Sequence, residues 1–247
     1  MWDFFYKLAS PRYFYEFAGR CLPWLTVPCV LLFAAGLYDG FLLAPPDYQQ
    51  GESYRIMFVH VPAAWMSLFV YVFMAVNAGI GLIWRIKLSE IMARASAPVG
   101  AAFTFLALVT GSLWGKPMWG TYWDWDARMT SELILLFLYL GFIALQASIE
   151  DPRAAAKAGA ILALAGLVNV PIIHYSVEWW NTLHQGPSVS KLSNPSIHIS
   201  MLTPLIWMAL AYKLYFAINL LLRARCEVLW RERGSQWVNE LLMENKS

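Results

Sequence analysis

The sequence contains few charged residues: Asp, Glu, Lys and Arg make up 14% of its 247 positions, against roughly 25% in soluble domains. Apolar residues make up 59%. This balance excludes an ordinary water-soluble domain, and the many Trp, Phe and Tyr side chains exclude a disordered chain. The formal net charge is only +2 and the basic residues are scattered, so nucleic acid is not expected as a partner.

Cysteine is scarce as well. The three cysteines, Cys21, Cys29 and Cys226, are far apart, so neither a disulfide framework nor a thiolate metal site is indicated. The chain also has no phosphate-binding glycine loop, no nucleophile elbow and no Cys-x-x-Cys-His motif for haem attachment. Neither end of the chain indicates catalysis.

Long hydrophobic runs, in contrast, are plentiful. Six of them approach the roughly 20 residues that cross a membrane core, and most are apolar on all sides, which is typical of helices in lipid. The first is no cleaved signal peptide, because it follows a long leader and is long enough to span. We therefore expect a single all-α integral membrane domain over residues 1–247. Its six transmembrane helices are predicted at 21–44, 57–84, 97–114, 133–149, 159–175 and 201–222.

Six crossings place both termini on the same side of the membrane. Thirteen of the eighteen Lys and Arg residues lie in the leader 1–20, in the second and fourth loops and in the tail 223–247, and four lie in the other loops. Because basic residues concentrate in cytoplasmic loops, both termini are predicted to be cytoplasmic. The more elaborate loops, which include 114–132 and 176–200, then face outward.

The two cytoplasmic ends are predicted to be structural. In the leader, Ser10 and Pro11 form a helix-start signal, and the aromatic-rich helix expected at 12–19 suits the membrane interface. The segment 227–243 mixes apolar and charged residues. It is predicted to form an amphipathic surface helix or a partner-docking element.

The outward loop 114–132 has the most unusual composition. One interpretation is an aromatic belt at the lipid headgroups. However, Gly115, Pro117 and Gly120 favour turns and close backbone approach, and indoles on a shaped loop form a flat platform for a large planar ligand. Both interpretations remain open at this stage. The four indoles lie within twelve positions and belong to Trp114, Trp119, Trp123 and Trp125.

Charged residues lie next to these indoles. Asp126 and Arg128 could pair with each other and so fix the loop, or Arg128 could bind a ligand carboxylate through two hydrogen bonds. Pairing within the loop is at least as plausible as ligand binding.

All four histidines fall in predicted outer loops or at outer helix ends. His60 lies among apolar residues at the membrane edge, where an imidazole needs a partner in the bundle or a ligand. His184 lies in the fifth loop beside Trp179 and Trp180. A lone histidine is usually a satisfied structural residue, but two of them beside a Trp-rich loop make ligation about equally plausible. The other two are His174 and His198.

A haem site would use these parts together. Neutral imidazole is a common axial ligand of haem iron, and the porphyrin needs an apolar wall. Two histidines from different outer loops could approach the iron from opposite faces. A structural zinc ion would require thiolates or further close ligands, so haem suits these residues better.

At this point the residues show a family resemblance. The pattern Trp-Gly-x-x-x-Trp-Gly-Thr-x-Trp-x-Trp-Asp at 114–126 resembles the signature of the haem-handling protein superfamily of cytochrome c biogenesis. Chain length, six spans, Phe-Val-His-Val-Pro at 58–62 and Trp-Trp-Asn-Thr-Leu-His-Gln-Gly-Pro at 179–187 resemble its short members, the cytochrome c maturation protein C (CcmC) family. The similarity extends over essentially the whole chain. Tyr122 departs from it, because many relatives are expected to have Trp there.

The resemblance implies a function and a set of ligands. Haem b would be held at the periplasmic face of a Gram-negative inner membrane, with His60 and His184 as axial ligands of the iron. The protein would transfer haem and not act as an enzyme. Its implied partners are the ABC transporter of CcmA and CcmB, the small protein CcmD, membrane lipid, and the haem chaperone CcmE, which receives the haem. The implied platform consists of Trp114, Trp119, Trp123, Trp125 and Asp126.

Two other functions remain possible from the residues alone. One is a membrane cytochrome b-type subunit that exchanges electrons with quinone, although such proteins usually place their ligands deep within the spans. The other is a scaffold whose Trp-rich loop docks a partner. His174 and His198 have no role in the family pattern and are interpreted as polar residues at helix ends.

Overall fold

The computed structural model describes residues 10–186, 189 and 194–244, and this part of the chain is built from helices. Two short elements, the π-helical turn η1 (Asp39–Leu43) and the 3-10 helix η2 (Glu52–Ile56), flank the first loop. The longer helices are α2 (Pro11–Tyr38), α3 (Met57–Trp84), α4 (Lys87–Trp119), α5 (Ala127–Ser148), α6 (Pro152–Gly166), α7 (Asn169–Trp179), α8 (Ile199–Arg231) and α9 (Gln236–Glu244).

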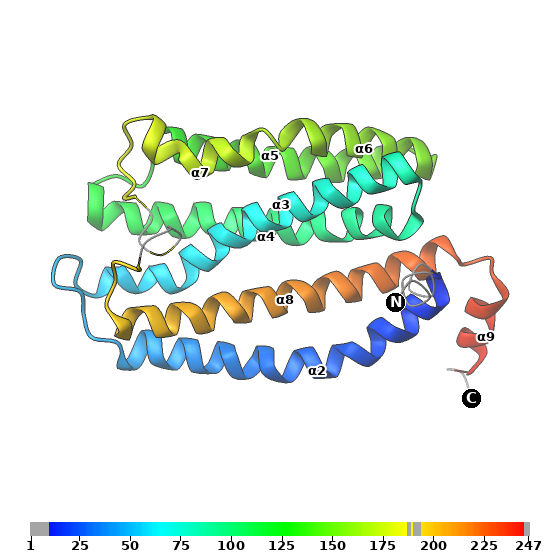
Figure 1. The fold of residues 1–247 in the computed structure, drawn as a ribbon, viewed down its shortest axis with the longest axis horizontal. Coiled ribbons are helices and arrows are strands. Elements are labelled where there is room, and N and C mark those ends of the chain that lie inside the picture. Colours follow the sequence, from blue (N-terminus) through cyan, green and yellow to red (C-terminus); the bar gives the residue numbers. More distant parts are fainter. Residues whose placement is uncertain (1–9, 187–188, 190–193, 245–247) are drawn as a thin grey trace.

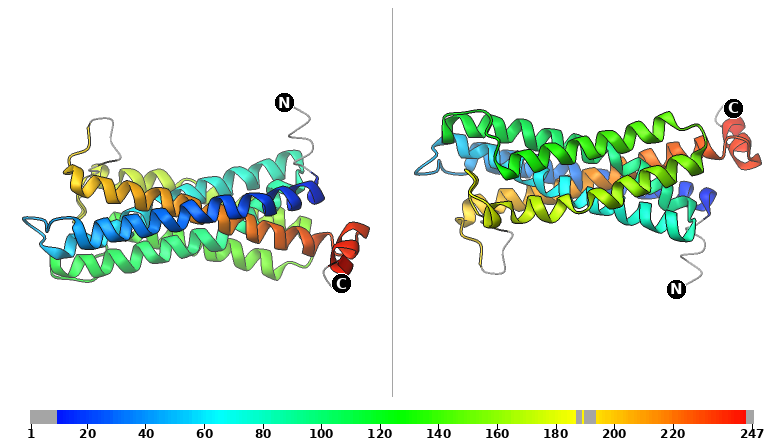
Figure 2. Two further views of the ribbon diagram at one scale, coloured as in Figure 1. Left: turned by 90° about the horizontal axis from the view of Figure 1, so that it is seen from below. Right: turned by 90° about the horizontal axis from the view of Figure 1, so that it is seen from above.

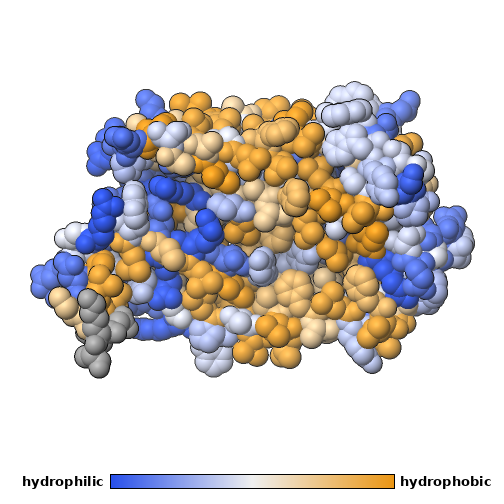
Figure 3. Space-filling model, turned by 180° about the vertical axis from the view of Figure 1, so that it is seen from behind, coloured by the Kyte–Doolittle hydropathy of each residue, from blue (hydrophilic) through white to orange (hydrophobic). Residues whose placement is uncertain are grey.

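Six segments of the described chain are long and apolar enough to cross a membrane, which confirms the predicted all-α fold with six spans. On the face that Figure 3 shows, hydrophilic residues gather toward the two ends of the molecule and hydrophobic residues cover most of the surface between them. The six candidate membrane-spanning segments are Pro11–Leu43, Glu52–Trp84, Lys87–Trp119, Ala127–Ser148, Pro152–Trp179 and Ile199–Arg231.

The helices form two groups that lie side by side (Figures 1 and 2). Helices α3 to α7 pack together, and the antiparallel pair of α2 and α8 lies against them through contacts of α8 with α3 and α4. Small residues allow the close approaches, as expected in membranes. A Cβ atom on Gly36 of α2 would lie 2.8 Å from the Sδ atom of Met208 on α8.

Both described ends of the chain lie at one end of the bundle (Figure 1), which we call the terminal end. At the opposite end, the loop end, lie the connections between α2 and α3, between α4 and α5, and between α7 and α8. All four histidines belong to segments at the loop end, as expected from the sequence: His60, His174, His184 and His198.

Several helix boundaries differ from the prediction. The expected leader helix and the first span are one continuous helix, α2, with Pro23 and Pro28 inside it; membrane helices tolerate such prolines. Helix α8 continues to Arg231, well into the predicted tail, and the amphipathic tail helix is confined to α9.

The fifth predicted span is divided into α6 and α7 by a turn. The hydroxyl group of Tyr71 packs where a Cβ atom on Gly166 would lie, so only glycine fits at the end of α6. Pro171 has no N–H group to donate to the carbonyl four residues earlier. The chain therefore bends between these two residues.

Candidate functional site

The candidate site lies at the loop end, where four segments converge. The first turn of α3 contributes His60, and the last turns of α4 contribute Trp114 and Trp119. The connection 120–126 leads into α5, and the loop after α7 carries His184. The structure thus brings together residues that are more than a hundred positions apart in the sequence.

His60 is held in place by α4. Its Nδ1 atom lies 3.0 Å from the carbonyl oxygen of Ala107 and 3.1 Å from Oγ1 of Thr110. A carbonyl oxygen only accepts hydrogen bonds, so Nδ1 carries the proton and Nε2 presents its lone pair. Gly111 makes room for the ring, because a Cβ atom there would lie 3.0 Å from Cε1 of His60.

His184 is held in the same manner by a carboxylate. Its Nδ1 atom lies 2.9 Å from Oδ2 of Asp126, and both side chains are largely buried. The backbone N–H group of His184 donates to Oγ1 of Thr182 at 2.9 Å. Because the carboxylate accepts the Nδ1 proton, Nε2 of His184 is again the ring nitrogen that presents its lone pair.

Asp126 has a second function, as the N-terminal cap of α5. Its Oδ1 atom accepts a hydrogen bond of 2.7 Å from the backbone N–H group of Met129. Burial by itself raises the pKa of Asp126, but hydrogen bonds from His184, Met129 and Thr182 outweigh burial and lower the pKa to about 2. The carboxylate is therefore ionised throughout the physiological range.

An indole contacts each imidazole. The ring of Trp114 lies edge to face with that of His60 at 5.8 Å between centroids, and Trp119 contacts His184 at 4.8 Å. Both indoles come from the end of α4. The structure thus forms two neighbouring units, each with one imidazole and one indole.

Glycines shape the end of α4. Gly120 ends the helix in the left-handed conformation, with φ of 77°, which glycine adopts without strain. Trp119 folds back over Gly115, where a Cβ atom would lie 3.0 Å from Cε3 of the indole. The turn signals in the sequence therefore have a structural role at both positions.

The other two predicted indoles form a separate pair. The rings of Trp123 and Trp125 lie 5.4 Å apart with their planes at 75°, so these two indoles are not coplanar. Trp125 is 74% exposed. The Nε1 atom of Trp123 is buried and has no hydrogen-bond partner in the described part of the chain.

Arg128 does not form the expected pair with Asp126. Its guanidinium group donates to Oγ of Ser176 at 3.2 Å and to the carbonyl oxygens of Ile173 and His174 at 3.3 Å. Asp126 instead pairs with a histidine from the next loop. Arg128 therefore ties the start of α5 to the end of α7, immediately before the loop that carries His184.

Some residues of the site gave no recognisable signal in the sequence. Gln50, in the first loop, accepts a hydrogen bond of 3.0 Å from Nε1 of Trp114. The acceptors Ala107 and Thr110 lie inside an apolar run and became visible only through helix packing. His198 caps α8, as expected of a polar residue at a helix end, whereas His174 lies exposed in the middle of α7 beside Tyr175.

Comparisons with known proteins confirm the resemblance. Residues 4–239 match the family model described as Heme exporter protein C, CcmC. The Heme exporter protein C of Escherichia coli strain K12 is 51% identical over 244 residues, which cover 99% of this chain and 98% of the relative. That of Haemophilus influenzae is 48% identical over 241 residues, covering 98% of each chain. That of Bradyrhizobium diazoefficiens is 53% identical over 224 residues, covering 91% and 85%. The chain belongs to the Heme exporter protein C family.

Proposed function

We propose that this protein binds haem at its loop end and passes it to another protein during the biogenesis of c-type cytochromes. One observation carries the proposal: His60 and His184 each donate Nδ1–H to a fixed acceptor, so that in each ring Nε2 is the nitrogen with the lone pair. This is the usual arrangement of metal-binding histidines, whose second nitrogen is held by a carbonyl or carboxylate group. Bis-imidazole ligation of haem iron requires two such nitrogens.

The surroundings of the imidazoles suit a porphyrin. Trp114 and Trp119 provide apolar contacts beside the two ligands, and the exposed ring of Trp125 extends the aromatic surface outward. The buried Nε1–H group of Trp123 has no partner and can donate to a carboxylate, which haem carries on its two propionates. In this proposal haem b is the cargo of the protein.

Release of the cargo follows from the different supports of the two ligands. His60 is part of a transmembrane helix, whereas His184 lies in a loop and is held by one carboxylate. We expect His184 to be the ligand that an acceptor's side chain replaces first. Transfer then requires the acceptor complex to bind haem more strongly than this site does alone.

The membrane location and the partners of the protein are also proposed, from its family and from the distribution of its basic residues. The terminal end carries most of the basic residues, which supports a cytoplasmic location for this end and a periplasmic location, at the inner membrane, for the haem site. The proposed partners are the transporter proteins CcmA and CcmB, the small protein CcmD, and CcmE as the haem acceptor. Relatives named Heme exporter protein C support a role within such an export system.

Absorption spectra of the purified protein test haem ligation. We expect wild type produced with ample haem to show a Soret band, and His60→Ala and His184→Ala to lose most of it. His174→Ala and His198→Ala are matched controls, because both histidines lie at the loop end but neither ring contacts a carbonyl or carboxylate group of the described residues; Nδ1 of His198 instead lies 2.8 Å from Oγ of Ser200. A band of wild-type size in both ligand variants would contradict the proposed ligation.

Transfer is tested separately with CcmE. Covalent haem on CcmE is measured by haem staining after coexpression with wild type or with Trp119, Trp123 and Trp125 all replaced by Ala. We expect the triple variant to load little haem. Equal loading would show that the indoles have no part in handling haem.

A further inference from the structure

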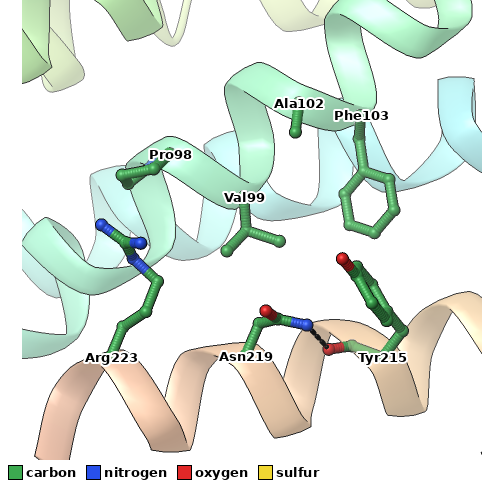
Figure 4. Close-up of a pocket in the computed structure, with 7 residues that line it drawn as sticks. All are labelled: Pro98, Val99, Ala102, Phe103, Tyr215, Asn219 and Arg223. Atoms are coloured by element: carbon green, nitrogen blue, oxygen red, sulfur yellow. Dashed lines mark hydrogen bonds between the residues drawn. The ribbon is translucent and has the colours of Figure 1, made fainter.

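A cavity lies between α4 and α8, away from the haem site (Figure 4). Its volume is about 170 Å³. One wall is a stripe of α8 formed by Tyr215, Asn219 and Arg223, and the facing wall is the part of α4 from Pro98 to Phe103 (Figure 4). This cavity is at the seam between the two helix groups, where α8 meets α4.

The two ends of the cavity differ in chemistry. Arg223 lies at one end, and the rings of Phe103 and Tyr215 lie at the other (Figure 4). The ring of Phe103 also stacks on Tyr212 at 5.5 Å, and Phe33 of α2 contacts both tyrosines. Aromatic rings from three helices therefore lie in or behind this end of the cavity.

Arg223, at the other end of the cavity, differs from two arginines nearby that form ion pairs. Nearby on the same helices, Arg231 pairs with Glu90 at 3.1 Å and Arg94 pairs with Glu227 at 3.3 Å. Arg223 is exposed and forms no ion pair with any residue in the described ranges. Its positive charge is thus available to a ligand.

The position of Arg223 corresponds to a membrane boundary. It follows directly after the apolar run 201–222 of α8, toward the terminal end. Eight residues separate it from Tyr215, which corresponds to about 12 Å along the helix axis. The cavity therefore extends from the depth of the lipid headgroups into the hydrocarbon region.

We propose that this cavity binds an anionic phospholipid of the leaflet at the terminal end, with its phosphate at Arg223 and one acyl chain against Val99 and Phe103. The shape favours such a ligand. The volume is below the roughly 300–1,000 Å³ of pockets for drug-sized ligands, and a transmembrane helix with a diameter of about 10 Å is far too wide. A short stretch of one flexible acyl chain fits, the rest of the chain continuing into the surrounding lipid, and basic residues at this depth attract anionic headgroups.

Native mass spectrometry of the full chain, released from nanodiscs of equal phosphatidylglycerol and phosphatidylethanolamine, tests the site. We expect wild type to retain one phosphatidylglycerol in preference to phosphatidylethanolamine. Arg223→Gln should reduce this preference about fivefold, the effect of one basic residue at an anionic surface. Ala102→Phe, which fills the cavity from an exposed position of α4, should abolish retention of either lipid.

Two controls separate the cavity from general effects. Arg153→Gln removes an exposed arginine from the start of α6, and Val109→Phe enlarges an exposed residue of α4 outside the cavity. Both should retain phosphatidylglycerol as wild type does, and all four variants should keep the haem spectrum of wild type. The proposal is overturned if wild type retains no lipid or shows no headgroup preference, or if Ala102→Phe retains lipid unchanged.

Discussion

Nδ1 of His184 lies 2.9 Å from Oδ2 of Asp126, and the other oxygen of the same carboxylate caps helix α5. One side chain thus fixes the ring orientation of a loop histidine relative to the rigid start of a helix. This arrangement explains how a residue on a loop can be positioned well enough to bind a metal.

Asp126→Asn should weaken haem binding without unfolding the protein. The amide can still cap α5 through its oxygen, but it no longer provides an anionic acceptor for Nδ1–H of His184. Loss of such a partner typically reduces metal affinity about 10–100-fold, which haem titration of the purified protein measures. Asp151→Asn is the matched control, because Asp151 caps α6 with a hydrogen bond of 2.7 Å. Equal affinity of wild type and Asp126→Asn would contradict the role of Asp126.

The pH dependence of folding stability should contain the titration of Asp126. Its pKa is lowered from the ordinary 3.8 to about 2 in the folded protein, so its stabilising contribution is complete above the ordinary value. The contribution disappears as the pH falls through the folded value. We expect the difference in thermal midpoint in detergent between wild type and Asp126→Asn, both measured without haem, to shrink below about pH 4 and to vanish near pH 2. A difference that persists unchanged at pH 2 would contradict the lowered pKa of Asp126.

The sequence was most informative where the free energy of transferring side chains from water to lipid determines the structure. All six spans follow from the length of the apolar runs. The grouping of His60, His184 and the indoles at one end follows because successive spans cross the membrane in opposite directions, so that alternate loops lie on the same side. The partner of Asp126 could not be predicted in this way. Charges two positions apart suggested a pair with Arg128, whereas the packing of α7 on α5 placed Ser176 near Arg128 and left Asp126 to His184.

Gly111→Ala should disturb His60, the second proposed ligand of the haem iron. The new Cβ atom would lie 3.0 Å from Cε1 of His60, so the ring must move and weaken its hydrogen bond to Ala107. We expect haem affinity to fall about tenfold, again the size of a lost supporting contact. Gly79→Ala serves as control, because its Cβ atom would meet Leu164 at an ordinary 3.4 Å. If both variants bind haem equally, the space at Gly111 is unimportant for His60.

Gly100→Ala should affect stability throughout the bundle. The ring of Tyr139 occupies the place of the added Cβ atom, and its hydroxyl donates to the carbonyl oxygen of Ser67 at 2.8 Å. Overpacking of this kind costs about 1–3 kcal/mol, and the displaced hydroxyl loses its partner. A thermal aggregation assay in detergent should show a lower midpoint than for wild type and Gly79→Ala. An unchanged midpoint would mean that Tyr139 can relocate without penalty.

Variants of Arg128 distinguish two roles of this residue: ligand binding through its charge and positioning of α7 through its hydrogen bonds. Its donors reach Ser176, Ile173 and His174 together, and the single ammonium group of lysine cannot reproduce that fork. If Arg128 positions the end of α7, Arg128→Lys should release haem about as fast as Arg128→Gln, because both loosen the loop that carries His184. If only its charge matters, Arg128→Lys should behave as wild type and Arg128→Gln alone should fail. We expect the first outcome, measured as the rate of haem loss to excess apomyoglobin, because the guanidinium group is already engaged by α7 in the structure.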